Sequence, residues 1–309
     1  MALIVAVSGA SGLIGAALVK ELTRRGHRVS RMVRRGARPG EISWDPAIGR
    51  LDPGDLEGLD GVVHLAGENV GVRWTVARKA RIRESRVKGT KLISETLAQL
   101  RRRPAVLVSA SAIGIYGSRG NELLTEASLP GDRSRDFLAS VSWEWEAAAE
   151  PARVAGIRVA HPRFGIVLSP RGGALRKMLL PFRLGLGGRM GSGSQWMSWI
   201  SIDDAVAAIL HLLSTDTLRG PVNVTSPEPL TNRDFAQTLG RVLARPTPLP
   251  LPAAALRLAL GEMADGTLLS SARVEPARLL ESGYRFQHPD LEKALRHVLG
   301  KEPRSNFPV

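Results

Sequence analysis

The chain has 309 residues, 43% of them hydrophobic, which is typical of a folded protein with a sizeable core. It contains no cysteine, which excludes disulfide bonds, thiolate catalysis and cysteine-ligated metals, and we predict no metal site. It carries 43 Lys and Arg against 29 Asp and Glu, a net charge of +14, yet only 5% of its residues are aromatic. Base stacking on nucleic acid needs more aromatic residues among the cations, so we expect no nucleic-acid partner.

Targeting and membrane signals are missing from this sequence. No stretch approaches the roughly 18 apolar residues of a membrane span. The N-terminal apolar run is too short, and too soon followed by glycine, for a signal peptide. We therefore expect a soluble, cytoplasmic protein with no membrane partner.

A glycine-rich turn near the N-terminus organises the chain. Residues 3–7 are all apolar and predict a buried parallel strand, and apolar residues at helical spacing follow from Leu13 until Gly26. In such a strand–turn–helix unit, glycines allow the backbone to approach a pyrophosphate, and the free amides of the helix face the anion. We expect a dinucleotide to contact Gly9, Ser11, Gly12, Leu13, Ile14 and Gly15. A purely structural turn is the alternative.

The second strand, Arg28 to Val33, indicates which dinucleotide is bound. An acidic residue at its end would hydrogen-bond the adenosine ribose of NAD. This chain has Arg34 and Arg35 there instead, and an arginine can pair with a 2′-phosphate. The sequence therefore favours NADP, with a surface role for Arg34 as the alternative.

Further strands end in small or polar residues that could line the same sheet edge. Residues 60–67 form an apolar strand that ends in small residues, and 105–108 form the next one. The expected cofactor contacts at or just after the ends of these strands are Leu65, Ala66, Gly67, Glu68 and Ser109. On the helix between them, Arg81 and Arg86 could each turn toward the pyrophosphate or face water.

The middle of the chain is harder to interpret. A strand is expected over 157–161, followed by a long irregular, glycine-rich segment over 172–193 that could form one wall of a substrate cleft. Arg183 and Arg189 could bind an anionic substrate there. Trp196 and Trp199 could stack on a ring or pack in the core. Asp203 or Asp204 suits an N-cap for the next helix, and prolines between 246 and 252 predict a stiff, extended link.

The chain resembles an extended short-chain dehydrogenase/reductase nearly from end to end. The resemblance is carried by the segments Gly9–Gly15, His64–Gly67 and Val87–Thr90, and by Ser111 with Tyr116 and Gly117. More narrowly, Leu65–Asn69, Trp145–Glu146 and Leu179–Gly188 are similar to an epimerase-like family often labelled nucleoside-diphosphate-sugar epimerase. Residues after about Leu249 resemble that family's C-terminal region of unknown function.

This resemblance implies an α/β fold with a doubly wound parallel sheet and a smaller C-terminal substrate lobe. The predicted division is a dinucleotide-binding core over 1–165, a cleft segment over 166–195, a return to the core over 196–222 and the substrate lobe over 223–309. The resemblance also implies that NADP lies along Gly9–Gly15, Arg34, Leu65, Ala66 and Arg86, with Ile166 near the nicotinamide. Family members often dimerise, so a homodimer is one possibility.

The residue pair that this superfamily normally uses for catalysis is missing. Hydride transfer normally relies on Tyr-x-x-x-Lys, but four residues after the two tyrosines, Tyr116 and Tyr284, stand Gly120 and His288. The remaining candidates for proton handling are Ser111, Tyr116 and Glu126. Two hypotheses follow: an NADP-dependent oxidoreductase or epimerase acting on a small, anionic or nucleotide-linked substrate, and an NADP-binding regulatory or sensor protein without turnover.

Overall fold

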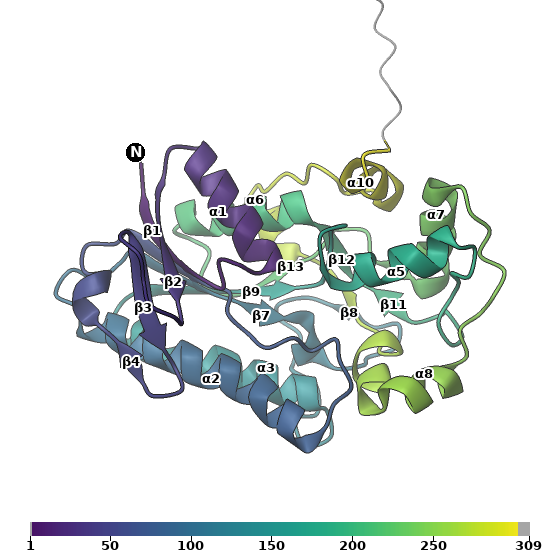
Figure 1. Cartoon of the computed structure of the whole chain (residues 1–309), viewed down its shortest axis with the longest axis horizontal. Helices are drawn as coiled ribbons and strands as arrows, with labels where there is room; N and C mark the ends of the chain where they lie inside the picture. The colour runs from purple at the N-terminus through teal and green to yellow at the C-terminus, as the bar shows by residue number, and fades with distance from the viewer. Residues whose placement is uncertain (1, 302–309) are drawn as a thin grey trace, which may run out of the picture.

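A computed structural model describes residues 2–301 and contains one large sheet with helices on both faces (Figure 1). The strands of this sheet are β1 (Ile4–Ser8), β2 (Arg28–Val33), β3 (Glu41–Asp45), β4 (Arg50–Leu51), β5 (Gly61–His64), β6 (Val106–Ser109), β7 (Ser111–Ala112), β9 (Arg158–Phe164) and β13 (Gly220–Val224). Their order is β13-β9-β6-β5-β1-β2-β3-β4, with β7 also pairing with β9. All pairs are parallel except β3 with β4. The predicted doubly wound parallel sheet is confirmed.

Successive residues of a strand point to opposite faces of the sheet, and here both sets are apolar, so helices cover both faces. On one face, Val5 and Val7 pack against α1 (Leu13–Arg24) and α6 (Ile202–Ser214). On the other, Ala6 packs in a core with residues of α2 (Val76–Gln99) and α4 (Glu150–Val154), and α3 (Phe137–Ala147) lies beside α2. The carboxyl ends of the parallel strands therefore meet at one edge, between two helical layers.

A second set of elements lies beyond that edge (Figure 1). It comprises β10 (Ile166–Leu168), α5 (Gly173–Arg183), β11 (Trp196–Met197), β12 (Trp199–Ser201), β14 (Leu230–Thr231), α7 (Asn232–Leu243), α8 (Ala253–Leu260), a π-helical turn (Ala264–Leu268) and α10 (Leu291–Val298). Leu179 and Phe182 of α5 share a core with Phe235 and Leu239 of α7. The stretch from 245 to 250 has no regular structure, as its prolines suggested.

Three expectations for the middle of the chain need correction. The segment from 172 was expected to be irregular, but Gly173–Arg183 forms helix α5, because Leu175, Leu179 and Phe182 recur on one buried face. Of the two alternatives for Trp199, stacking on a ring is wrong and packing in the core is confirmed, because its side chain is fully buried. The N-cap of α6 is Ser201, whose hydroxyl accepts from the Asp204 amide at 2.9 Å, instead of Asp203 or Asp204.

The C-terminal part of the chain pairs with and packs against elements from the first part. Strand β15 (Arg273–Val274) pairs with β8 (Leu123–Leu124), and α9 (Ala277–Glu281) packs against β13. The Tyr284 hydroxyl donates to the Asp204 carbonyl at 2.9 Å. Within residues 2–301, none of the helices combines the length and apolar character that crossing a membrane requires.

Candidate functional site

The turn between β1 and α1 is built on glycines. Gly9 has a φ of +66°, in the left-handed region that favours glycine, and its carbonyl accepts from the Gly12 amide at 2.9 Å. A Cβ on Gly15 would lie 2.2 Å from the Gly9 carbonyl oxygen, so only glycine lets α1 pack this closely on the turn. Gly12 begins the helix without a side-chain cap. The amides of the first turn therefore remain available to an anion such as a pyrophosphate.

Neighbouring strands end beside this turn. Ser8 at the end of β1 pairs in register with Met32 of β2 and with His64 of β5. Arg34 consequently lies just past the sheet edge, where its side chain is exposed. On the side of β1 that faces β5, the Leu65 amide donates to the Ser8 carbonyl at 3.3 Å.

The remaining predicted contacts lie along the same edge. Ser109 ends β6 and pairs in register with His64, which ends β5. Ser109 therefore lies at the same edge of the sheet as the residues that directly follow β5, namely Leu65, Ala66, Gly67 and Glu68. Ser11, Leu13 and Ile14 lie at the turn and in the first turn of α1. The sequence-predicted residues are thus brought together, while their contact with a cofactor stays a prediction.

Arg86 of α2 holds the loop that follows β5. Its Nη1 atom donates to the carbonyls of Glu68 at 3.0 Å and Ile82 at 3.1 Å, and its guanidinium lies 4.9 Å from the Trp145 ring. Burial lowers the pKa of Arg86 to about 10, although the nearby Glu68 carboxylate opposes this shift. Glu68 forms its ion pair with Arg78 instead. Arg81, in contrast, is exposed on the same helix.

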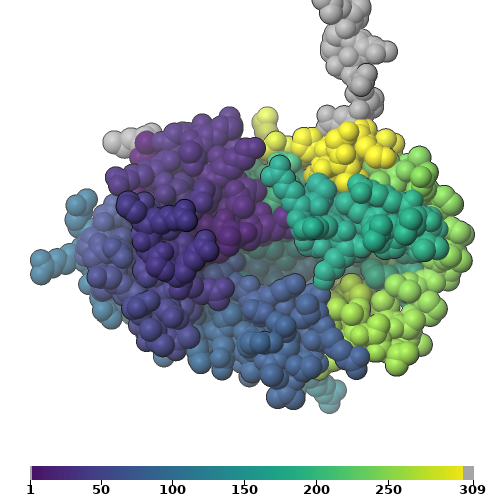
Figure 2. Space-filling model, in the orientation of Figure 1, coloured from purple at the N-terminus to yellow at the C-terminus, as the bar shows by residue number. Residues whose placement is uncertain are grey.

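Helix α5 begins directly beside the glycine turn. A Cβ on Gly172 or Gly173 would lie 3.3 Å from the Leu13 side chain. Further along α5, Lys177 Nζ donates to the Gly71 carbonyl at 2.5 Å, which joins this helix to the loop after β5. Ile166, the predicted nicotinamide contact, begins β10 just before α5 and is half-buried. Figure 2 shows the surface hollowed where the N-terminal segment, α2 and α5 meet.

The three residues predicted for proton handling belong to one chain of buried hydrogen bonds. Ser111 Oγ donates to Glu146 Oε1 at 2.6 Å, and Arg163 donates to both Glu146 oxygens at 2.8 Å. Arg163 Nη1 also donates to the Tyr116 hydroxyl at 2.8 Å. We call Ser111, Glu146, Arg163, Tyr116, Asn223 and Glu126 the buried polar network.

The network continues from Tyr116 to the C-terminal part of the chain. The Tyr116 hydroxyl donates to Asn223 Oδ1 at 2.7 Å, and Asn223 Nδ2 donates to the Glu275 carbonyl at 2.9 Å. The backbone amide of Asn223 donates to Glu126 Oε1 at 2.8 Å. Glu126 therefore binds backbone groups, and burial raises its pKa.

Tyr116 is fully buried, which bears on its predicted role as an acid. Burial raises the pKa of its hydroxyl, although the neighbouring Arg163 guanidinium opposes the shift. The proton of this hydroxyl is already donated in the hydrogen bond to Asn223 Oδ1. This geometry favours a structural role for Tyr116, and a catalytic role stays a prediction.

Sequence reasoning missed three members of the network: Glu146, Arg163 and Asn223. Glu146 was noted only as part of a family motif, and no role was predicted for Arg163 or Asn223. A signal was nevertheless present, because a charged residue inside an apolar strand, as Arg163 is in β9, must be paired when it is buried.

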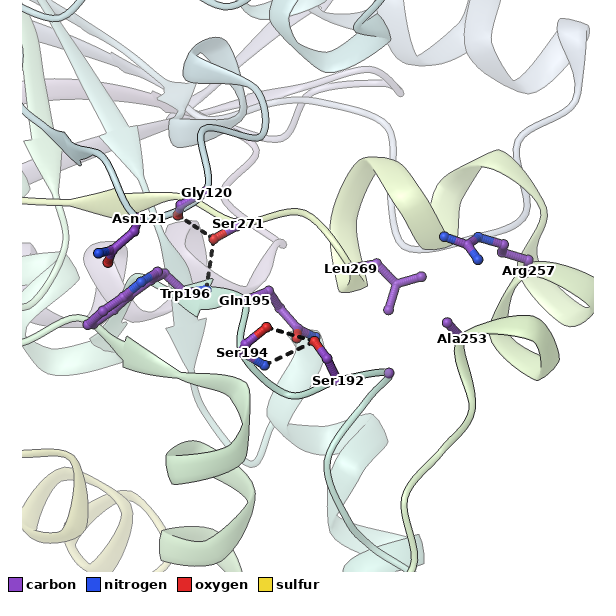
Figure 3. Close-up of a pocket in the computed structure, with 11 residues that line it drawn as sticks. Gly120, Asn121, Ser192, Ser194, Gln195, Trp196, Ala253, Arg257, Leu269 and Ser271 are labelled. Carbon is purple, nitrogen blue, oxygen red and sulfur yellow. Dashed lines mark hydrogen bonds between the residues drawn. The ribbon is translucent and has the colours of Figure 1, made fainter.

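A separate cavity of about 560 Å³ lies between the loop after Tyr116, residues 191–196 and residues 253–271 (Figure 3). Its lining residues include Asn121, Ser192, Trp196, Arg257 and Ser271. Ser271 ties the walls together, since its hydroxyl donates to the Gly120 carbonyl at 2.6 Å and accepts from the Trp196 amide at 3.0 Å. Ser192, near the end of the glycine-rich segment that was expected to form a cleft wall, therefore lines part of this cavity.

Arg183 and Arg189 are not among the residues that line this cavity. Arg189 Nη1 instead donates to the carbonyls of Gly191 at 2.9 Å and Ser192 at 2.8 Å. Away from both regions, Asp203, His288 and His297 bring potential metal-ligand atoms within 4.8 Å of one another. The expectation that the chain has no metal site therefore stays a prediction.

Comparison with known proteins places this arrangement in a family. The model of the NAD dependent epimerase/dehydratase family matches residues 5–224, which include the glycine turn, the strand ends and the buried polar network. The chain belongs to this family. Residues 251–298 match a further family model, described only as a domain of unknown function. The predicted resemblance, including its C-terminal region, is confirmed.

Relatives within the family cover nearly the whole chain. The epimerase family protein Mb2239 of Mycobacterium bovis is 43% identical over 96% of this chain and 97% of its own length. A crystal structure of the human epimerase family protein SDR39U1 with NADPH has a TM-score of 0.88 at 34% identity, covering 97% of this chain and 100% of that one. A nucleoside-diphosphate sugar epimerase from Corynebacterium glutamicum has a TM-score of 0.82 at 38% identity, covering 99% of this chain and 60% of that one.

Proposed function

We propose that this protein binds NADP(H) at the glycine turn and acts as an epimerase-like oxidoreductase on a small, anionic or nucleotide-linked substrate. The observation that carries the proposal is the close packing of α1 on the turn, with Gly15 against the Gly9 carbonyl at the carboxyl edge of the sheet. A pyrophosphate fits beside the uncapped first turn of α1. The NADPH in the crystal structure of the human relative supports the same choice of ligand.

Arg34 supports NADP(H) over NAD(H). It follows β2 beside the glycine turn, and no acidic residue stands at the end of that strand. A guanidinium can form charge-assisted hydrogen bonds with a 2′-phosphate, which NAD(H) lacks. Arg86 adds positive charge at the other side of the turn, where its guanidinium donates to backbone carbonyls.

Replacing Arg34 tests this choice of cofactor. Hydrogen bonds to charged groups contribute roughly 1.5–3 kcal/mol, so Arg34→Ala should weaken NADPH binding about 10- to 100-fold and leave NADH binding nearly unchanged. Titrations of nucleotide fluorescence would measure both affinities, with Arg35→Ala as the matched control. Equal losses for NADPH and NADH would contradict the assignment.

The substrate class is supported by the cavity and by the related proteins. Serine hydroxyls, the Asn121 amide and the Trp196 ring line the cavity, together with Arg257, whose guanidinium is paired with Asp265. These groups suit a ligand that combines a ring with anionic or hydroxyl groups. The C. glutamicum relative bears the name of a nucleoside-diphosphate sugar epimerase. Ser111, which is held by Glu146 and does not line this cavity, is the candidate contact for the reacting oxygen.

A sensor without turnover is the second candidate, and the tyrosines favour it. Both Tyr116 and Tyr284 are buried, and neither has a lysine four residues later. Incubation with NADPH and panels of carbonyl compounds and nucleotide sugars, followed at 340 nm, separates the two candidates. Oxidation of NADPH or a change in sugar stereochemistry would support the enzyme. Tight NADPH binding with neither would support the sensor.

A further inference from the structure

The buried polar network carries a fixed direction of hydrogen bonding. At its C-terminal end, Asn223 Nδ2 donates to the Glu275 carbonyl, so its Oδ1 must accept from Tyr116. The Tyr116 oxygen then accepts from Arg163, which can only donate. Arg163 directs two further N–H groups at Glu146. Every bond from Asn223 to Glu146 thus has one allowed direction.

This direction determines the state of Glu146. Burial alone would raise the pKa of its carboxyl group, but hydrogen bonds and charge from Arg163 outweigh burial and hold the pKa below its usual range. The other titratable neighbour, His161, has its pKa lowered by burial and stays uncharged near neutral pH. Glu146 is therefore a carboxylate near neutral pH, and a carboxylate only accepts hydrogen bonds.

We propose that Glu146 is a positioning residue that fixes the Ser111 hydroxyl as a hydrogen-bond acceptor toward the substrate, so that the site selects a hydroxyl or amine over a carbonyl. A serine hydroxyl has one proton and two acceptor lone pairs. The 2.6 Å bond to Glu146 takes the proton, which leaves only lone pairs for a ligand. The substrate part of this inference rests on the proposed function.

The consequence for binding is a preference among chemically matched ligands. A ligand hydroxyl can donate a hydrogen bond to Ser111. A ligand carbonyl can only accept, so it cannot form a hydrogen bond with the lone pairs of Ser111. An unmade hydrogen bond at a buried group weakens binding by roughly 5- to 100-fold.

The direction of the Ser111 bond can be tested without any ligand, because the chain has no cysteine. Ser111→Cys introduces a single thiol, whose pKa can be read from the ¹³C shift of labelled cysteine during a pH titration. A thiol that donates to a carboxylate should have a pKa above the ordinary value of about 8.5. Adding Glu146→Gln, with Arg163 still present, should lower that pKa by at least about one unit.

Ser214→Cys, on the exposed end of α6, serves as the matched control, and its thiol should titrate near about 8.5 with or without Glu146→Gln. Circular dichroism confirms that each variant is folded. The positioning role would be overturned if the thiol of Ser111→Cys had a pKa at or below that of the control thiol, or one that Glu146→Gln left unchanged. The outcome is independent of NADP(H) binding, so it separates this inference from the proposed function.

The ligand preference is tested on the NADP⁺-saturated protein. Ligand-observed NMR would compare small alcohols with their matched ketones, such as cyclohexanol with cyclohexanone, at millimolar concentration. We expect the alcohols to bind at least about 5-fold more tightly, and Ser111→Ala to remove the difference. Ketones that bind as well as their alcohols, or alcohols that do not bind, would contradict the preference.

Discussion

At the scale of single residues, the pair of Glu146 and Arg163 has the clearest energetic consequence. Their side chains are only 14% and 7% exposed, and two hydrogen bonds of 2.8 Å join them. Removing one partner of such a pair leaves an uncompensated buried charge, which typically costs about 3–5 kcal/mol. The pair therefore links α3 to β9.

Glu146→Gln should therefore lower the free energy of unfolding by about 3 kcal/mol near neutral pH. Urea denaturation measures this difference. Glu150→Gln is the control, because its ion pair with Arg153 is exposed and should contribute little to stability. A loss for Glu146→Gln no larger than that of the control would contradict the buried charge pair.

The pH dependence of this stability has a definite sign. The pKa of Glu146 is lower in the folded protein than its unfolded value of about 4.3, because Arg163 outweighs the effect of burial. Its contribution is thus fully present above about pH 4.3 and is lost as the pH falls through the folded pKa. The stability difference between wild type and Glu146→Gln should narrow in acid. A difference that stays constant down to about pH 3 would show that charge is not its cause.

At the scale of elements, the contact of α1 with the glycine turn is the feature on which the proposed cofactor site depends. The substitution Gly15→Ala would place a Cβ 2.2 Å from the Gly9 carbonyl oxygen, so the helix must move away. Overpacking of this kind costs about 1–3 kcal/mol. We also expect NADPH affinity to fall at least about 10-fold, because the first-turn amides move with the helix.

Gly36→Ala is the matched control for this substitution. A Cβ on Gly36 meets nothing within 4 Å. Thermal unfolding and NADPH titration of both variants provide the measurements. If Gly15→Ala binds NADPH as tightly as Gly36→Ala does, the turn is not the pyrophosphate site.

Element by element, sequence reasoning was most successful where the signal is local. The glycine turn, the strand Arg28–Val33 and the helix that carries Arg81 and Arg86 follow directly from glycine spacing and apolar periodicity. Helix α5 was missed because the glycines that flank it on both sides obscured its helical pattern. The short strands β3 and β4 were not predicted either, since only pairing within the sheet defines them.

The candidate site was less accessible to sequence reasoning. Ser111 and Glu126 could be chosen as polar residues near strand ends, but the partners of Ser111 come from residues 35 and 52 positions further along the chain. Nothing in the local sequence reveals that Glu146 and Arg163 face each other. The absence of Tyr-x-x-x-Lys, in contrast, could be established from the sequence by inspection. The buried polar network could be found only in the structure.

At the scale of the whole molecule, the C-terminal part of the chain completes cores that begin in the first part. Leu279 and Tyr284 pack in the core of β1, α1 and α6. Val274 packs with Tyr116 and Leu124. The boundaries predicted from sequence between the two parts stay a prediction, but the shared cores argue against independent folding.

We accordingly expect a single cooperative unfolding transition for the full chain. Circular dichroism reports on the large sheet and its helices, and fluorescence reports on the 6 tryptophans. In urea, the two signals should change at the same midpoint. Two separated transitions, with helical structure retained after the first, would contradict the shared cores.

A crystal structure of the protein grown with NADPH would locate the bound cofactor directly. We expect the pyrophosphate at the N-terminus of α1, the 2′-phosphate within hydrogen-bonding distance of Arg34, and the nicotinamide between Ile166 and Ser111. NADPH bound elsewhere, or bound with its nicotinamide directed away from Ser111, would contradict the proposed site.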